Sequence, residues 1–135
     1  MKRLLLAVLF LASLILPSNA AEKANTVLIH PGETIYARFE PKGKKIRLVS
    51  YAKEKDEGAQ VILTLGPDAK KPEFYSLKVE NMFPKDLTYK LEMRSLSLKK
   101  KMNVPVTPVV AGKVAFELFP PQAEELALTE FQLEK

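Results

Sequence analysis

The chain has 135 residues, no cysteine, no tryptophan and a single histidine, and its formal net charge is +5 at neutral pH. A chain of this length predicts one domain with one hydrophobic core. The lack of cysteine excludes disulfide bonds, thiolate metal sites and cysteine catalysis. The modest positive charge does not by itself indicate nucleic-acid binding, and basic and aromatic residues do not interleave as they do in single-strand binders.

The first 20 residues have the pattern of a cleavable secretory signal peptide. A cationic start, Met1–Arg3, precedes the apolar stretch Leu4–Leu16, and small residues precede the expected cleavage before Ala21. The apolar stretch is shorter than the roughly 20 residues that span a bilayer. We therefore expect residues 1–20 to be removed and residues 21–135 to form a single exported domain without a transmembrane anchor.

Removal of this leader changes the charge and indicates a location. The leader contains two basic residues and no acidic residue, so the net charge falls from +5 to +3. Small proteins secreted into oxidising fluids usually carry disulfides. The cysteine-free chain therefore favours a bacterial periplasm, with the extracellular space as the alternative. A bacterial lipoprotein anchor is excluded, because that anchor needs a cysteine directly after the signal.

Apolar and polar residues alternate along most of the remaining chain, which predicts β-strands with one buried face. The expected strands cover residues 25–29, 34–40, 46–53, 61–65, 75–80, 87–94, 114–118 and 126–133. In the segment 46–53 the even-numbered residues are predicted to face the core and the odd-numbered ones to face outward. In the segment 114–118, Val114, Phe116 and Leu118 are predicted to face inward.

Two segments depart from simple alternation. Val104–Pro108 contains two prolines, which cannot donate to a sheet ladder, so it is expected to be an edge strand or a covering loop. In the last segment Leu126 and Leu128 share one parity, whereas Phe131 and Leu133 share the other. This change of phase predicts a β-bulge or a short helical turn.

Short strands at intervals of roughly 8 to 12 residues, with no amphipathic helix, favour an all-β fold. We expect a two-sheet, immunoglobulin-like sandwich of about eight strands. A small closed β-barrel is the alternative.

The second half of the chain carries a resemblance. The segments Ser76–Asn81, Leu87–Met93, Phe116–Pro120 and Leu126–Leu133, with a turn at Gly112, are similar to small exported bacterial proteins that have an immunoglobulin-like sandwich and no assigned function. The resemblance implies the fold and an envelope location. It implies no functional residue.

Recognisable catalytic motifs are missing from the sequence, which has no G-x-S-x-G, H-E-x-x-H or Gly-rich phosphate loop. His30 is the one candidate base for a nucleophile, and it precedes Pro31 and Gly32, where a turn is the simpler interpretation. The carboxylates available for acid–base chemistry lie in two charged loops: Glu54, Asp56, Glu57, Glu124 and Glu125. We therefore expect a non-enzymatic protein with no cofactor.

A small periplasmic copper carrier is an alternative function. Its soft ligands would be Met82, Met93 and Met102, with His30 as an imidazole ligand. These residues form no M-x-x-M or H-x-M cluster, and Met93 is also expected to fill the core. No metal ligand is therefore assigned.

The basic residues form two groups near predicted strand ends. These groups are Lys42, Lys44, Lys45 and Arg47, and then Lys99, Lys100 and Lys101. If they meet on one rim, they can bind an anionic lipid or glycan. Alternatively they keep the protein soluble and protect a sheet edge.

An outward-facing patch is the leading candidate for a binding site. Tyr36, Arg38, Val49 and Tyr51 are predicted to lie on the outer faces of two neighbouring strands. An exposed apolar and aromatic patch of this kind can mark a partner surface. The leading hypothesis is therefore a non-enzymatic exported protein that binds another envelope or secreted protein.

Overall fold

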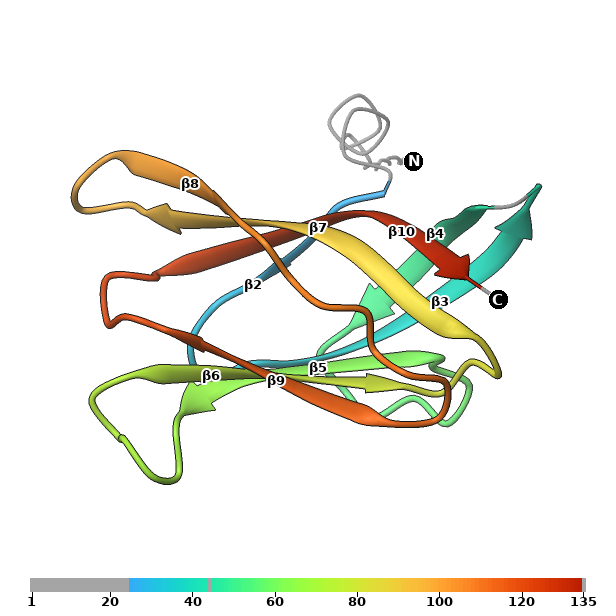
Figure 1. The fold of residues 1–135 in the computed structure, drawn as a ribbon, viewed down its shortest axis with the longest axis horizontal. Coiled ribbons are helices and arrows are strands. Elements are labelled where there is room, and N and C mark those ends of the chain that lie inside the picture. The colour runs from blue at the N-terminus through green and yellow to red at the C-terminus, as the bar shows by residue number, and fades with distance from the viewer. Residues whose placement is uncertain (1–24, 44, 135) are drawn as a thin grey trace, which may run out of the picture.

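The computed structural model describes residues 25–43 and 45–134, and these residues form nine β-strands and no helix (Figure 1). The expected signal peptide lies outside the described residues. In chain order the strands are β2 (Val27–Ile29), β3 (Thr34–Lys42), β4 (Lys45–Ala52), β5 (Val61–Pro67), β6 (Tyr75–Asn81), β7 (Asp86–Ser95), β8 (Lys100–Val104), β9 (Val114–Phe119) and β10 (Glu125–Glu134). In this part of the chain, no helix is long and apolar enough to cross a membrane.

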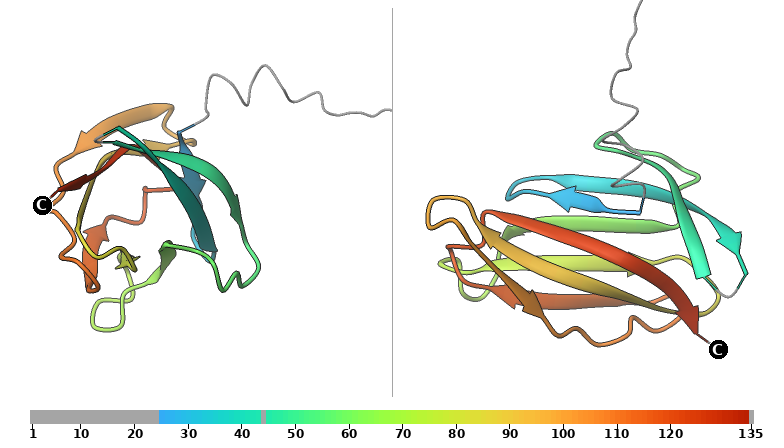
Figure 2. Two further views of the ribbon diagram at one scale, coloured as in Figure 1. Left: turned by 90° about the vertical axis from the view of Figure 1, so that its right-hand side faces the viewer. Right: turned by 90° about the horizontal axis from the view of Figure 1, so that it is seen from above.

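The strands form one antiparallel sheet that curls into a half-barrel (Figures 1 and 2). Their order is β8-β7-β10-β4-β3-β5-β6-β9, and β2 pairs with the first half of β10. The all-β class is confirmed. The two-sheet sandwich is not confirmed, because ladders connect all nine described strands, although the β10–β4 ladder is the single pair Gln132 and Lys45. Among the described residues no ladder joins β8 to β9, so both are edge strands.

The hydrophobic core fills the inside of the curled sheet. Ile35 of β3, Leu63 of β5 and Leu77 of β6 are completely buried, and Leu126 and Leu128 of β10 are buried beside them. These side chains come from the alternating positions that the sequence pattern predicts. Burial of such apolar surface stabilises the fold by roughly 25 cal/mol per Å².

Strand β9 faces the opposite way from the expectation. Val114, Phe116 and Leu118 are 46%, 64% and 54% exposed, whereas Phe119 is 2% exposed and buried in the core. The prediction that the first three side chains face inward is therefore wrong. The sequence Val-Ala-Phe-Glu-Leu-Phe carries apolar residues at both parities, and the burial of the large Phe119 side chain determines which parity points inward.

A β-bulge in the β3–β4 hairpin changes the outward face of β4. Arg38 stands opposite Ser50 and Phe39 stands opposite Leu48, so Val49 is an extra residue on β4. The even-numbered residues therefore face the core only as far as Leu48, and Ser50 is exposed. The expectation of a single alternation along the whole segment 46–53 is wrong at this bulge.

Two other irregularities agree with the sequence pattern. The ladder between β10 and β7 shifts between Thr129 and Gln132, which confirms a bulge in the last strand. After the edge strand β8, Val109 is buried and exchanges two backbone hydrogen bonds with Leu87 (2.8 and 2.9 Å). Residues 105–108 are thus a covering loop, one of the two expected forms, whereas the edge strand β8 occupies residues 100–104, where no strand was expected.

Candidate functional site

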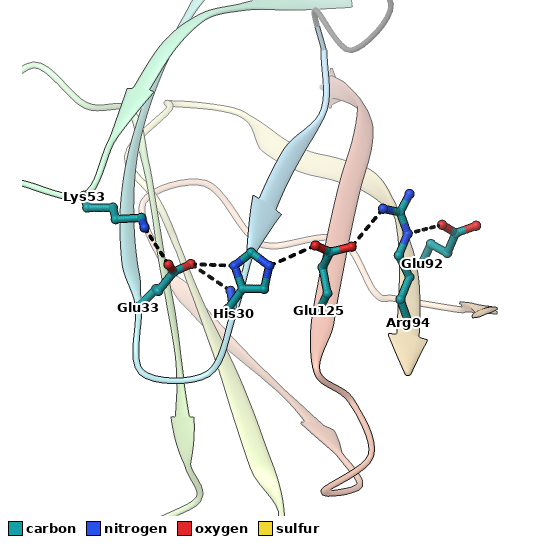
Figure 3. A network of polar contacts seen from close by, with 6 residues as sticks. All are labelled: His30, Glu33, Lys53, Glu92, Arg94 and Glu125. Carbon is teal, nitrogen blue, oxygen red and sulfur yellow. Dashed lines mark hydrogen bonds and ion pairs between the residues drawn. The ribbon is translucent and has the colours of Figure 1, made fainter. Parts of the chain in front are cut away.

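A chain of charged side chains surrounds the single histidine (Figure 3). His30 lies in the turn between β2 and β3. Its Nδ1 atom is 3.2 Å from a carboxylate oxygen of Glu33, and its Nε2 atom is 2.9 Å from one of Glu125. Lys53 Nζ lies 2.7 Å from Glu33, and Arg94 Nη1 lies 2.9 Å from Glu125.

The electrostatics of this network favour the charged form of every member. The hydrogen bond to Glu125 raises the pKa of His30, and the bond to Glu33 adds to this effect although burial opposes it. Burial disfavours the Glu125 carboxylate, yet the hydrogen bonds from Arg94 and His30 outweigh burial and lower the pKa of Glu125. Each carboxylate faces a cation, so this network holds together the β2–β3 turn, β10 and β7. General-base catalysis needs a free lone pair on the base. Both ring nitrogens of His30 contact carboxylates, so this geometry does not offer one.

Two of the candidate copper ligands, Met93 and Met102, are neighbours, but His30 and Met82 do not join them. Met93 and Met102 stand opposite each other on β7 and β8. Both ring nitrogens of His30 contact carboxylates instead of a methionine, and Met82 is exposed in the loop after β6. Within the described residues, no group of three or more histidine and acidic side chains is arranged to hold a metal ion.

The acidic loop before β5 is also engaged in an ion pair. Asp56 accepts two hydrogen bonds of 2.6 Å from Arg38 and one of 3.0 Å from the Gly58 N–H. The Arg38 guanidinium is the main cause that lowers the pKa of Asp56 to about 2. Glu54 and Glu57 beside it are exposed. This arrangement fixes a surface loop.

The bulge on β4 divides the expected tyrosine patch. Residues directly opposite each other in a ladder point to the same face of the sheet. Tyr51 stands opposite the buried Ala37, whereas Tyr36 and Arg38 belong to the other face. Val49 is 54% exposed and Tyr51 is 41% exposed. The register therefore separates Tyr51 from Tyr36, contrary to the outward patch expected from the sequence.

The two basic groups lie at opposite ends of the molecule (Figures 1 and 2). Lys42, Lys45 and Arg47 belong to the β3–β4 hairpin, where Arg47 forms an ion pair with Glu40. The Lys99–Lys101 run belongs to the β7–β8 hairpin at the other end. Lys44 lies outside the described residues. The expected common rim is therefore not formed by these two hairpins.

The outer side of β9 presents apolar side chains and backbone groups together. The Asn81 N–H donates to the Lys113 carbonyl at 3.0 Å, which makes this a hydrogen-bonded pair. Antiparallel pairs alternate, so Val114, Phe116 and Leu118 occupy the non-hydrogen-bonded positions opposite β6. Their N–H and C=O groups therefore point away from β6, toward what we call the β9 edge.

The other edge of the sheet is different. Strand β8 has Lys100 and Lys101 at its start and is followed by Pro105, and lysine and proline are residues that protect an edge from pairing with another strand. The β9 edge carries Val114, Phe116 and Leu118 in the corresponding exposed positions. Of the end strands β8 and β9, β9 is the one with the chemistry for strand addition.

The interior next to the β9 edge contains polar groups. Glu117 faces inward on β9. Burial raises the pKa of Tyr89 on β7, and the negative charge of Glu117 adds to this effect. The Tyr89 hydroxyl is buried and has no hydrogen-bond partner among the described residues. A hollow of about 440 Å³ adjoins Tyr89, lined also by Asn103 and Val106.

Comparisons of the chain with protein-family models, with curated proteins and with solved structures gave no match. The candidate site therefore rests on the geometry of the chain itself. Sequence reasoning missed the β9 edge, because it assigned the apolar residues of this strand to the core. The signal that could have found it is Phe119, a large apolar residue of the opposite parity directly before Pro120, which competes for the same core space.

Proposed function

We propose that this protein is a non-enzymatic binding protein that pairs its β9 edge with an extended segment of another envelope or secreted protein. The observation that carries the proposal is the coincidence of outward backbone groups and exposed apolar side chains at Val114, Phe116 and Leu118. Strand addition uses the backbone groups for affinity and the alternate side chains for specificity.

The inner side of the β9 edge restricts the chemistry of the partner. An inward-facing charge such as Glu117 disfavours non-specific pairing of an edge strand with another chain. A partner strand that brings a basic side chain to this position would neutralise Glu117 and offer a donor to the Tyr89 hydroxyl. The expected partner segment therefore alternates apolar residues on the outer face with a lysine or arginine on the inner face.

The immunoglobulin-like sandwich and the exported location belong to this proposal. What supports a sandwich-like arrangement is the single-pair ladder between β10 and β4, which nearly divides the sheet into two halves. What supports export is the leader pattern of residues 1–20.

Site-specific photo-crosslinking in the producing cell tests the proposed function. A photoreactive amino acid at Leu118 is expected to give a covalent adduct with a partner protein, and the same group at Val49 on β4 is the control. Phe116→Pro removes an edge N–H without removing a bond to β6, so it is expected to abolish the adduct while the fold persists. Equal adducts from both positions, or an adduct that survives Phe116→Pro, would contradict the proposal.

A further inference from the structure

The turn that joins β7 to β8 exposes large apolar side chains. Leu96 and Leu98 in the turn are 57% and 56% exposed, and Met102 in the adjoining strand β8 is 60% exposed. The turn forms the left-hand end of the molecule in Figure 1, away from the β3–β4 hairpin. We call residues 96–102, which project from the sheet and expose these apolar side chains to solvent, the β7–β8 tip.

The same tip is strongly basic. Lys99, Lys100 and Lys101 are all exposed, and among residues 25–43 and 45–134 no ion pair joins them to a carboxylate. One carboxylate, Glu124, does contact the turn, where it accepts a 2.8 Å hydrogen bond from the Ser97 N–H. The three lysines outnumber this single negative charge, so the tip is cationic.

A hollow lies behind the tip. It has a volume of about 440 Å³, and Met93, Leu98, Met102 and Pro120 line it together with two of the lysines. The apolar lining is thus directly next to cationic groups. This combination matches the chemistry of an amphiphile with a negative head group and a hydrocarbon chain.

We propose that the β7–β8 tip docks on the surface of an anionic phospholipid bilayer. Leu96 and Leu98 enter the boundary between head groups and acyl chains, and Lys99–Lys101 lie among the phosphates. Charge complementarity selects this occupant, since lysines are attracted to anionic head groups and the exposed leucines and methionine beside them offer apolar surface to the acyl chains. The tip and the β9 edge are separate surfaces, so this inference stands independently of the proposed function.

Vesicle sedimentation with the purified exported protein tests the electrostatic half of the proposal. Binding is expected to mixed phosphatidylglycerol–phosphatidylcholine vesicles, to weaken with added salt and to be lost on pure phosphatidylcholine. Each lysine near an anionic surface contributes about fivefold in partitioning, so changing Lys99, Lys100 and Lys101 to Ser is expected to weaken binding about a hundredfold. Lys42→Ser with Lys45→Ser, on the opposite hairpin, is the matched charge control and is expected to change binding little.

The Lys99→Gly variant removes one charge from the turn without disturbing its backbone conformation. Lys99 has a φ of +53°, a left-handed conformation that glycine adopts more easily. The variant is therefore expected to keep or raise the melting temperature while binding falls about fivefold. A loss of binding in this variant cannot be attributed to unfolding.

Tryptophan fluorescence tests the apolar half. Because the chain has no tryptophan, Leu98→Trp gives a single reporter at the tip, and Val49→Trp gives one on β4. Anionic vesicles are expected to shift the emission of the first to shorter wavelength and to leave the second unchanged. Absence of binding to anionic vesicles, equal losses for the two lysine sets, or an unshifted tip reporter would each overturn the proposal.

Discussion

The Nε2 atom of His30 lies 2.9 Å from a carboxylate oxygen of Glu125, although 95 positions separate the two residues in the chain. The contact joins the β2–β3 turn to the start of β10, and Arg94 of β7 extends it on the other side. The only histidine of the chain therefore connects strands that come from its two ends. The stability that this contact contributes is expected to depend on pH.

Replacing His30 with Gln is expected to lower stability in a window of mildly acidic pH. The folded-state pKa of His30 is raised above 6.5, so its stabilisation is complete below pH 6.5 and is lost as pH rises through the raised value. At lower pH the effect requires Glu125 to stay ionised, and the pKa of Glu125 is below 4.5. Because the imidazole is 42% exposed, we expect less than about 1 kcal/mol. Urea unfolding of both proteins across pH measures it, and a difference independent of pH would contradict the assignment.

Tyr89→Phe is expected to stabilise the isolated protein. The Tyr89 hydroxyl is buried with no partner among the described residues, and such a group costs roughly 1 to 3 kcal/mol. Removing it is expected to raise the free energy of unfolding by about 1 kcal/mol, as measured by chemical denaturation. Tyr36→Phe, at a half-buried position, is the control and should change stability by less than about 0.5 kcal/mol. A destabilised Tyr89→Phe variant would mean that the hydroxyl is satisfied within the protein.

Two phenylalanines of β9 distinguish the observed orientation of this strand from the one expected from sequence. Phe119→Ala removes a core side chain and is expected to cost about 3 to 5 kcal/mol. Phe116→Ala removes an exposed one and is expected to cost less than about 0.5 kcal/mol. Thermal or urea unfolding of the two variants checks the orientation, and similar losses at both positions would be inconsistent with it.

The bulge in β10 gives a prediction about backbone conformation. Glu130 has a φ of +52°, which costs a residue with a side chain about 1 to 2 kcal/mol relative to glycine. Glu130→Gly removes this cost, but the greater entropy of glycine in the unfolded chain offsets part of the gain. The variant is therefore expected to stabilise the fold by about 0.5 kcal/mol. Thr129→Gly, one residue earlier with no positive φ, is expected to destabilise by about 1 kcal/mol. The melting temperatures of the two variants should therefore move in opposite directions.

Alternation predicted the all-β class and the inward face of β7, because Leu87, Tyr89 and Leu91 leave only one consistent parity. It was wrong on β9, where both parities are apolar and only the available core space decides. It was also wrong beyond Leu48, since the bulge at Val49 depends on how β3 and β4 pair. Local pattern is informative where it is unambiguous and fails where a neighbouring strand determines the register.

The candidate sites were likewise only partly predictable from the sequence. The lysine run Lys99–Lys101 was visible in the sequence, and its position on a projecting tip was not. The network around His30 depends on contacts to Glu125 and Lys53, which only the folded sheet brings near. The β9 edge could not be found without the strand order, because an edge is defined by the partner that a strand lacks.

The position of β10 has a consequence for how the protein folds. This last strand pairs with β7 along most of its length and also with β2 and β4, so it holds the two halves of the sheet together. Without β10, no ladder among the described strands joins the pair β7–β8 to the group β4-β3-β5-β6-β9. Such long-range pairing makes folding slow. Docking of β10 is therefore the step that closes the sheet around its core, and we expect this step to limit the rate of refolding.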